Sequence, residues 1–250
     1  MHYGALDALD SLRSGAAAAD GVIHLAFNFS DYARAVAADL LTVETIGAAL
    51  EGSGKPFVIT SGTSVLTSLL PSGRLATEED AGAVAAPRTA VENAAIALAE
   101  RGVRSSVVRL PSVHGPGHHG FVPTLIAISR TKGISAYVGD GSNRWPAVHR
   151  LDAARLFRLA VEAAPVGSRL HGVGDEGVPF RDIADIIGRH LNLPVVSISR
   201  EEATSHFGSL GAIVSADNPT SSVLTQERLG WRPVHPALIP YLEQGHYFNR

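Results

Sequence analysis

The chain contains no cysteine and no run of lysines or arginines. Its net charge at pH 7 is −3. The lack of cysteine excludes disulfides, thiolate metal sites and a cysteine nucleophile, and it fits the reducing cytoplasm, which is the predicted location. A nucleic-acid partner requires a basic face, so none is expected. The composition instead favours a small-molecule ligand.

Long apolar runs are missing as well. No stretch approaches the ~20 residues that span a bilayer, and the N-terminus lacks the charged and apolar regions of a signal peptide. We therefore expect no membrane association. The 250 residues, 45% of them hydrophobic, suffice for the core of one α/β domain of ordinary size.

Apolar and helical segments alternate in the first half of the chain. Apolar runs at 21–27, 56–61 and 105–110 are separated by helical patterns at 36–50 and 88–101. This alternation predicts a doubly wound parallel sheet, with the first run buried on both faces. Further helices are expected at 7–18, 122–131, 151–163, 180–191 and 201–207, strands at 135–138 and 194–198, and a mobile segment at 209–222.

A glycine-rich phosphate loop should precede these runs, because glycines let the backbone approach a pyrophosphate at a helix N-terminus. Residues 1–20 contain no such element. A literal G-x-G-x-x-G occurs at Gly172, Gly174 and Gly177, but two acidic residues inside it would repel a pyrophosphate. We interpret that segment as a plain strand-to-helix turn and the sheet as N-terminally incomplete.

Five segments, in order and spacing, resemble the extended short-chain dehydrogenase/reductase family of NAD-dependent epimerases, dehydratases and dihydroflavonol-type reductases. They are GVIHLAF, PFVITSG, SSVVRLPSVHGPG, WPAVHRLDAARL and LGWRP, from Gly21 to Pro233. The resemblance implies a partial NAD(P)-binding Rossmann-like domain at 1–120. Residues 121–250 would be mostly a small α/β substrate-binding part, intertwined with the first.

The resemblance also implies that about 50 residues, the size of a strand-helix-strand unit plus one strand, would precede the chain. The strand at 22–27 would then present an unpaired apolar edge, which natural proteins avoid. A truncated gene, a fragment, or a homodimer that covers this edge are the alternatives.

The resemblance implies specific site residues, with NAD or NADP as the cofactor and a small molecule as the substrate. The cofactor-binding positions are Leu25, Ala26, Phe27, Thr60, Ser61, Arg88, Pro111 and Val113. The catalytic positions are Thr63, Ser61 and Arg88, and the substrate-side positions are His114, Trp145 and His149.

Three catalytic positions depart from the family pattern. The tyrosine position falls on Val84, the lysine position on Arg88 and the serine position on Gly62, whose neighbours include Thr63. Valine cannot transfer a proton, whereas arginine keeps the charge that binds a ribose or phosphate. The acidic position near the adenine falls on Ala5.

Two functional hypotheses follow from these departures. The first is an NAD(P)-dependent oxidoreductase or epimerase-dehydratase that acts on an alcohol or ketone, with the proton supplied by water or by His114. The second is a catalytically silent cofactor-binding or sensing protein, or a fragment that does not bind the cofactor.

Several polar and aromatic residues have simpler interpretations. His114, His118 and His119 lie on a glycine-rich stretch without nearby carboxylates, so a loop beside the site is preferred to a metal centre. We interpret His24 as a hydrogen-bonded core histidine and Arg109 as paired with a buried acid or a carbonyl group. Asp152 is interpreted as an N-cap or a ligand contact, and Trp145 as a packing residue rather than a stacking platform.

Overall fold

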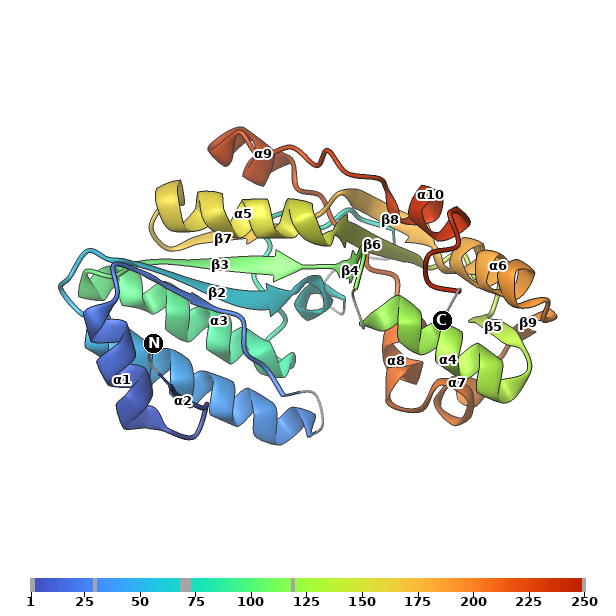
Figure 1. The fold of residues 1–250 in the computed structure, drawn as a ribbon, viewed down its shortest axis with the longest axis horizontal. Helices are drawn as coiled ribbons and strands as arrows, with labels where there is room; N and C mark the ends of the chain where they lie inside the picture. Colours follow the sequence, from blue (N-terminus) through green and yellow to red (C-terminus); the bar gives the residue numbers. More distant parts are fainter. Residues whose placement is uncertain (1–2, 29–30, 68–72, 118–119, 249–250) are drawn as a thin grey trace.

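Four parallel strands form the central sheet, in the order β1-β2-β3-β7 (Figure 1). The structure is a computed structural model that describes residues 3–28, 31–67, 73–117 and 120–248. The strands are β1 (Val22–His24), β2 (Pro56–Gly62), β3 (Arg104–Leu110) and β7 (Ser168–His171). This sheet confirms the predicted α/β, Rossmann-like fold.

Helices cover both faces of the sheet. α1 (Leu9–Ala18), α2 (Tyr32–Leu50) and α3 (Pro87–Ala97) lie on one face, and α5 (Arg150–Ala163) lies on the other (Figure 1). Alternate β2 side chains supply the two cores: Phe57 packs with the first three helices and Val58 packs with α5. α3 continues as a 3₁₀ turn (Leu98–Arg101) that ends at Gly102, where a φ of 71° favours glycine, as predicted.

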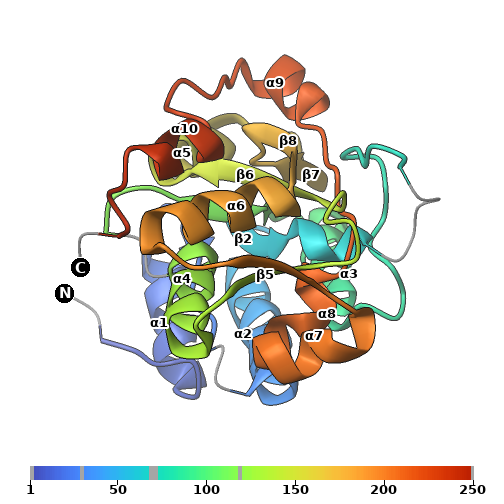
Figure 2. The same ribbon diagram turned by 90° about the vertical axis from the view of Figure 1, so that its right-hand side faces the viewer.

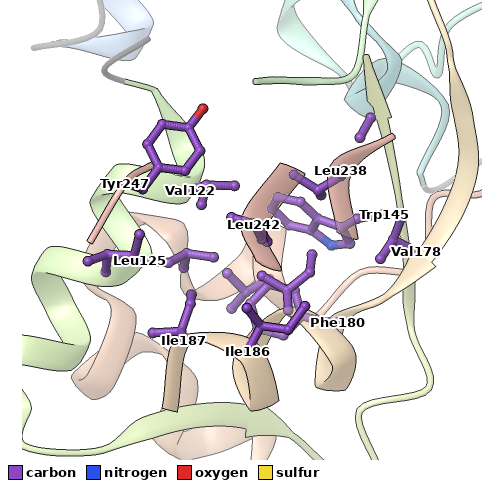
Figure 3. Close-up of a cluster of buried hydrophobic side chains, with 14 of the residues drawn as sticks. Val122, Leu125, Trp145, Val178, Phe180, Ile186, Ile187, Leu238, Leu242 and Tyr247 are labelled. Carbon is purple, nitrogen blue, oxygen red and sulfur yellow. The ribbon is translucent and has the colours of Figure 1, made fainter. Parts of the chain in front are cut away.

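A second group of elements packs beside the carboxyl end of this sheet (Figure 2). It contains a parallel pair, a three-stranded mixed sheet and several helices around a core that includes Trp145 and Phe180 (Figure 3). The elements are β4 (Ser112–His114), α4 (Phe121–Lys132), β5 (Ser135–Val138), β6 (Arg144–His149), β8 (Asp175–Pro179), α6 (Phe180–Leu191), β9 (Val195–Ile198), α7 (Arg200–Phe207), α8 (Gly211–Val214) and α10 (Leu238–Glu243). α9 (Val223–Leu229) lies instead beside α5, over the central sheet (Figure 1).

The first strand is shorter and more exposed than predicted. Only Val22–His24 is strand, and Ile23 and Leu25 are 40% and 58% exposed. Among the described residues β1 pairs with β2 alone, so its other edge is unpaired, as the resemblance implied. The exposure of Ile23 shows that the expectation of burial on both faces is wrong.

The segment predicted to be mobile, 209–222, is also different from the expectation. It contains α8, and the stretch that follows is held by backbone hydrogen bonds, including those from Asn218 N to Arg144 O and from Thr220 N to Glu176 O. These bonds join residues far apart in the sequence, which is why no local periodicity marked them.

The sequence interpretation missed the short strands β4, β6, β7 and β8. Each has only three to six residues, and polar side chains interrupt its apolar pattern. The rejected G-x-G-x-x-G motif starts directly after β7, and its last glycine, Gly177, lies inside β8 rather than in a turn. Within the described part of the chain, no helix is long and apolar enough to cross a bilayer.

Candidate functional site

The parallel strands β1, β2 and β3 end at the same edge of the sheet. This edge brings together the predicted cofactor residues that follow each strand: 25–27 after β1, 60–63 at the end of β2, and 111–113 after β3. In open α/β sheets, ligands bind outside the carboxyl ends of the strands. The topology therefore places the predicted residues where a ligand is expected.

Arg88, from the first turn of α3, crosses to this edge. Its Nη2 donates to Asp39 Oδ2 at 2.9 Å and to the carbonyl oxygen of Thr60, and its side chain is 13% exposed. Its Cζ lies 4.4 Å from the centroid of the Phe27 ring, a cation–π contact. The predicted residues Phe27, Thr60 and Arg88 thus contact one another.

Asp39 holds Arg88 from α2. Its other oxygen, Oδ1, lies 2.7 Å from His24 Nε2, and the two side chains are 2% and 7% exposed. His24 is therefore a hydrogen-bonded core histidine, as predicted. The sequence analysis missed Asp39, although the spacing Asp39, Val43, Ile46 places this carboxylate on the buried stripe of α2 and could have marked it.

Thr63 and Ser61 flank the position where the family serine would lie. Thr63 Oγ1 accepts a hydrogen bond from Asn218 Nδ2 at 3.0 Å, which leaves the hydroxyl proton of Thr63 free to donate. Ser61 Oγ is buried, and no described residue is its hydrogen-bond partner. Asn218 was not predicted, because 155 positions separate it from Thr63.

The position of the family tyrosine has no proton-transfer group. Val84 is 100% exposed, and Ala5 at the adenine position is exposed too. No tyrosine among the described residues takes part in the hydrogen bonds of Thr63 or Arg88.

A hollow of about 230 Å³ lies beyond the end of β2; Thr63 is 3% exposed and does not line it. It lies between the residues that follow β2 and the segment 216–219, and Asn218 belongs both to its wall and to the Thr63 hydrogen bond. Its lining residues are Leu66, Thr67, Gly73, Arg74, Ala76, Arg200, Ala216, Asp217, Asn218 and Pro219.

The predicted substrate residues His114 and His149 are neighbours across β4 and β6, with ring centroids 5.4 Å apart. His149 also stacks on His235 at 4.6 Å. Burial, together with the nearby His235, lowers the pKa of His149. His114 is fully buried, and His118 and His119 lie outside the described residues.

Asp152 is not an N-cap, contrary to one of the two expectations. The cap of α5 is His149, whose Nδ1 accepts from Leu151 N at 3.3 Å. Asp152 instead accepts from the backbone N–H groups of Val234 and His235 and lies 3.0 Å from His235 Nδ1. Although burial acts to raise the pKa of Asp152, these hydrogen bonds lower it. The carboxylate thereby fastens the C-terminal segment to α5.

Trp145 lies in the second core, at the opposite end of β6 from His149. Its ring stacks on Phe121 at 3.8 Å and meets Phe180 edge-on at 5.5 Å, and the residue is 7% exposed (Figure 3). The packing role that we considered for Trp145 agrees with these contacts. A substrate role stays a prediction.

Arg109 pairs with a buried acid, as predicted. Its Nε and Nη2 donate to Glu92 at 3.0 and 2.6 Å, and its Nη1 donates to Asp80 O at 2.7 Å and faces His171 Nε2 at 3.3 Å. Arg109 and Glu92 are 0% and 1% exposed. This group stabilises the sheet from within and does not open onto the site.

The chain matches the NAD dependent epimerase/dehydratase family over residues 1–170. An uncharacterized protein of Schizosaccharomyces pombe is 49% identical over 251 residues, with 99% of this chain and 84% of the relative covered. The chain belongs to this epimerase/dehydratase family. A second uncharacterized relative, from Saccharomyces cerevisiae, is 42% identical over 98% of this chain and 83% of its own length.

Solved structures with the same fold include enzymes of this kind. DesIV, a dTDP-glucose 4,6-dehydratase from Streptomyces venezuelae with NAD bound, has a TM-score of 0.76 at 19% identity, covering 97% of this chain and 77% of its own. RMD from Pseudomonas aeruginosa, complexed with NADPH, has a TM-score of 0.74 at 19% identity, covering 100% and 88%. The cofactor class that the family implies, NAD(P), is the one predicted.

The described residues fit one end of such a cofactor. Arg88 Nε is buried, and neither it nor Ser61 Oγ has a hydrogen-bond partner among the described residues. Buried polar groups are normally hydrogen-bonded, so both atoms suit the hydroxyl oxygens of a ribose or the polar edge of a nicotinamide. The described residues contain no glycine-rich turn at β1 for a pyrophosphate, so the fit concerns the ribose and nicotinamide end alone.

Proposed function

We propose that this epimerase/dehydratase family member is an NAD(P)-dependent oxidoreductase or epimerase-dehydratase that acts on an alcohol or ketone carbon of a small molecule. The observation that carries the proposal is the position of Arg88. Asp39 holds its side chain at the carboxyl ends of β1 and β2, and its Nε has no hydrogen-bond partner among the described residues. NAD and NADPH in the structural neighbours support it. A cytoplasmic location and a homodimer remain proposals.

In this proposal, residues at the strand ends would hold the cofactor, whose nicotinamide would supply the hydride acceptor or donor. Arg88 would bind the ribose through its N–H donors and would position the cofactor rather than exchange protons. The other contacts come from Leu25, Ala26, Phe27, Thr60, Ser61, Pro111 and Val113.

Thr63 would donate its hydroxyl proton in a hydrogen bond to the substrate oxygen. Asn218 already donates to Thr63 Oγ1, and this bond directs the remaining proton away from the amide. The proton that the substrate oxygen gains or loses would come from water or from His114. Because His114 is fully buried, its participation requires a relay through neighbouring groups.

The test is turnover of the natural full-length protein with NADH and NADPH on a panel of alcohols, ketones and sugars. Thr63→Val removes the hydroxyl at nearly constant volume and should lower kcat/KM about tenfold or more, the scale of one lost transition-state contact. Thr63→Ser keeps the hydroxyl and is the matched control. Equal rates for the valine and serine variants would show that Thr63 does not polarise the substrate.

The second candidate is a catalytically silent cofactor-binding protein. The fully exposed Val84 at the tyrosine position favours it, because no proton-transfer group occupies that place. It predicts thermal stabilisation by NAD(P) without redox change on the whole panel. A single reproducible turnover rules it out.

A further inference from the structure

We propose that the hollow beyond the end of β2 binds an anionic group of the substrate, a carboxylate or a phosphate. The inference deepens the proposed function and rests on it for the identity of Thr63 as the residue at the reacting oxygen. It draws on the charges around the hollow, on its size, and on Asn218, which belongs both to its wall and to the Thr63 hydrogen bond.

The charge that faces the hollow is positive. Arg200 lines it and has no carboxylate within 4.0 Å among the described residues; its Nη2 donates to Ser215 O at 3.3 Å. Arg74, the second arginine of the wall, contacts Asp80 through Nη2. In a chain with a net charge of −3, two arginines at one hollow are not part of a generally basic surface.

The acid in the wall, Asp217, is already neutralised. Its Oδ1 accepts from Arg144 N at 2.7 Å and from Arg144 Nε at 3.1 Å, and its Oδ2 accepts from Arg144 Nη2 at 2.8 Å. Burial acts to raise the pKa of Asp217, but the hydrogen bonds from Arg144 and Gly73 lower it. Asp217 therefore stays ionised and paired, and it leaves the charge of Arg200 uncompensated.

The size of the hollow narrows the ligand class. Its volume of about 230 Å³ is below the roughly 300–1,000 Å³ of sites that hold drug-sized ligands. Leu66, Ala76 and Pro219 supply apolar wall for a short carbon skeleton. The space suits the anionic end of a hydroxy or keto acid, a sugar acid or a sugar phosphate. The guanidinium fork suits carboxylate and phosphate oxygens equally.

The hollow and the reacting position share one residue. Asn218 forms part of the wall, and its Nδ2 is 3.0 Å from Thr63 Oγ1. A substrate anchored by its anion at Arg200 would thus reach toward Thr63 past Asn218, the residue that the hollow and the Thr63 hydrogen bond share. Two attachment points fix the orientation of the reacting carbon, which is the positioning that catalysis needs.

The experiment measures binding to the full-length protein by calorimetry in low-salt buffer, because salt screens such contacts. The probes are glucuronate and glucose 6-phosphate, each against neutral glucose, and inorganic phosphate alone. We expect at least one anionic probe to bind tenfold or more tightly than glucose. Arg200→Gln should abolish that preference, whereas Arg158→Gln, an exposed arginine of α5, should keep it.

Three results would each overturn the inference. They are equal binding of anionic and neutral probes, equal effects of the two variants, and no binding of any anionic probe at millimolar concentration.

An NADH titration of the same samples separates the two proposals. Anion binding through Arg200 without cofactor binding would support the anion site and contradict the proposed function. Cofactor binding without a preference for anions would support the proposed function and contradict the anion site. Tighter binding of glucuronate would indicate a site for a carboxylate, and tighter binding of glucose 6-phosphate or inorganic phosphate would indicate a site for a phosphate group.

Discussion

Two arginine–carboxylate pairs involve α3, one turn apart, and they differ in how completely the arginine is bonded. Glu92 of α3 binds Arg109, whose Nε, Nη1 and Nη2 all donate to protein acceptors in full burial. Within the described part of the chain, Arg88 of α3 binds Asp39 and Thr60 O through Nη2 alone. A saturated arginine can only stabilise the fold, whereas the partly bonded one, at the strand ends, retains donors for a ligand.

The buried pair should show the largest effect on stability. Glu92→Gln removes the charge that compensates Arg109, and loss of one partner of a buried ion pair costs about 3–5 kcal/mol of unfolding free energy. Urea denaturation measures it. Arg101→Gln, which breaks the exposed Glu51–Arg101 pair, is the control and should leave the midpoint unchanged. A midpoint equally unchanged in Glu92→Gln would show that the pair does not hold the sheet.

The same buried group makes stability depend on pH through His171. Burial, and then the charge of Arg109, lowers the pKa of His171 to about 3. Its Nδ1 contacts Ser221 O and its Nε2 faces Arg109, an arrangement of the neutral ring. Because the unfolded chain takes up this proton near pH 6.5 and the folded chain does not until about 3, stability falls as the pH drops through that window.

At pH 5 the loss from His171, relative to pH 7, should be ~2 kcal/mol. Urea denaturation at the two pH values measures it, and His171→Gln should remove most of the difference. If the variant and the parent lose the same free energy between pH 7 and pH 5, other groups cause the dependence.

Local patterns in the sequence predicted the long elements and failed on short or long-range ones. β2, β3 and the helices from α2 to α6 follow from apolar periodicity and glycine positions, because each element carries enough residues to show its period. β4, β7 and β8 are too short, and their strand pairing is decided by partners far along the chain.

The candidate site divides in the same way. Arg88 and Thr63 were predicted because family motifs mark their neighbourhood. Asp39 lies 49 positions before Arg88 and Asn218 lies 155 positions after Thr63, so only the folded chain shows that they are partners. Val84 and Gly62 were predicted as departures from the family, and the structure supplies no described side chain that replaces the tyrosine at Val84.

The most direct test of the account is an NADH and NADPH titration of the natural full-length protein and of Arg88→Ala, with Arg101→Ala as the surface control. We expect Arg88→Ala to weaken cofactor binding about tenfold or more, roughly 1.4 kcal/mol, while it lowers the urea midpoint less than Glu92→Gln does. Equal cofactor affinities for Arg88→Ala and Arg101→Ala would contradict the claim that the partly bonded arginine is the cofactor ligand.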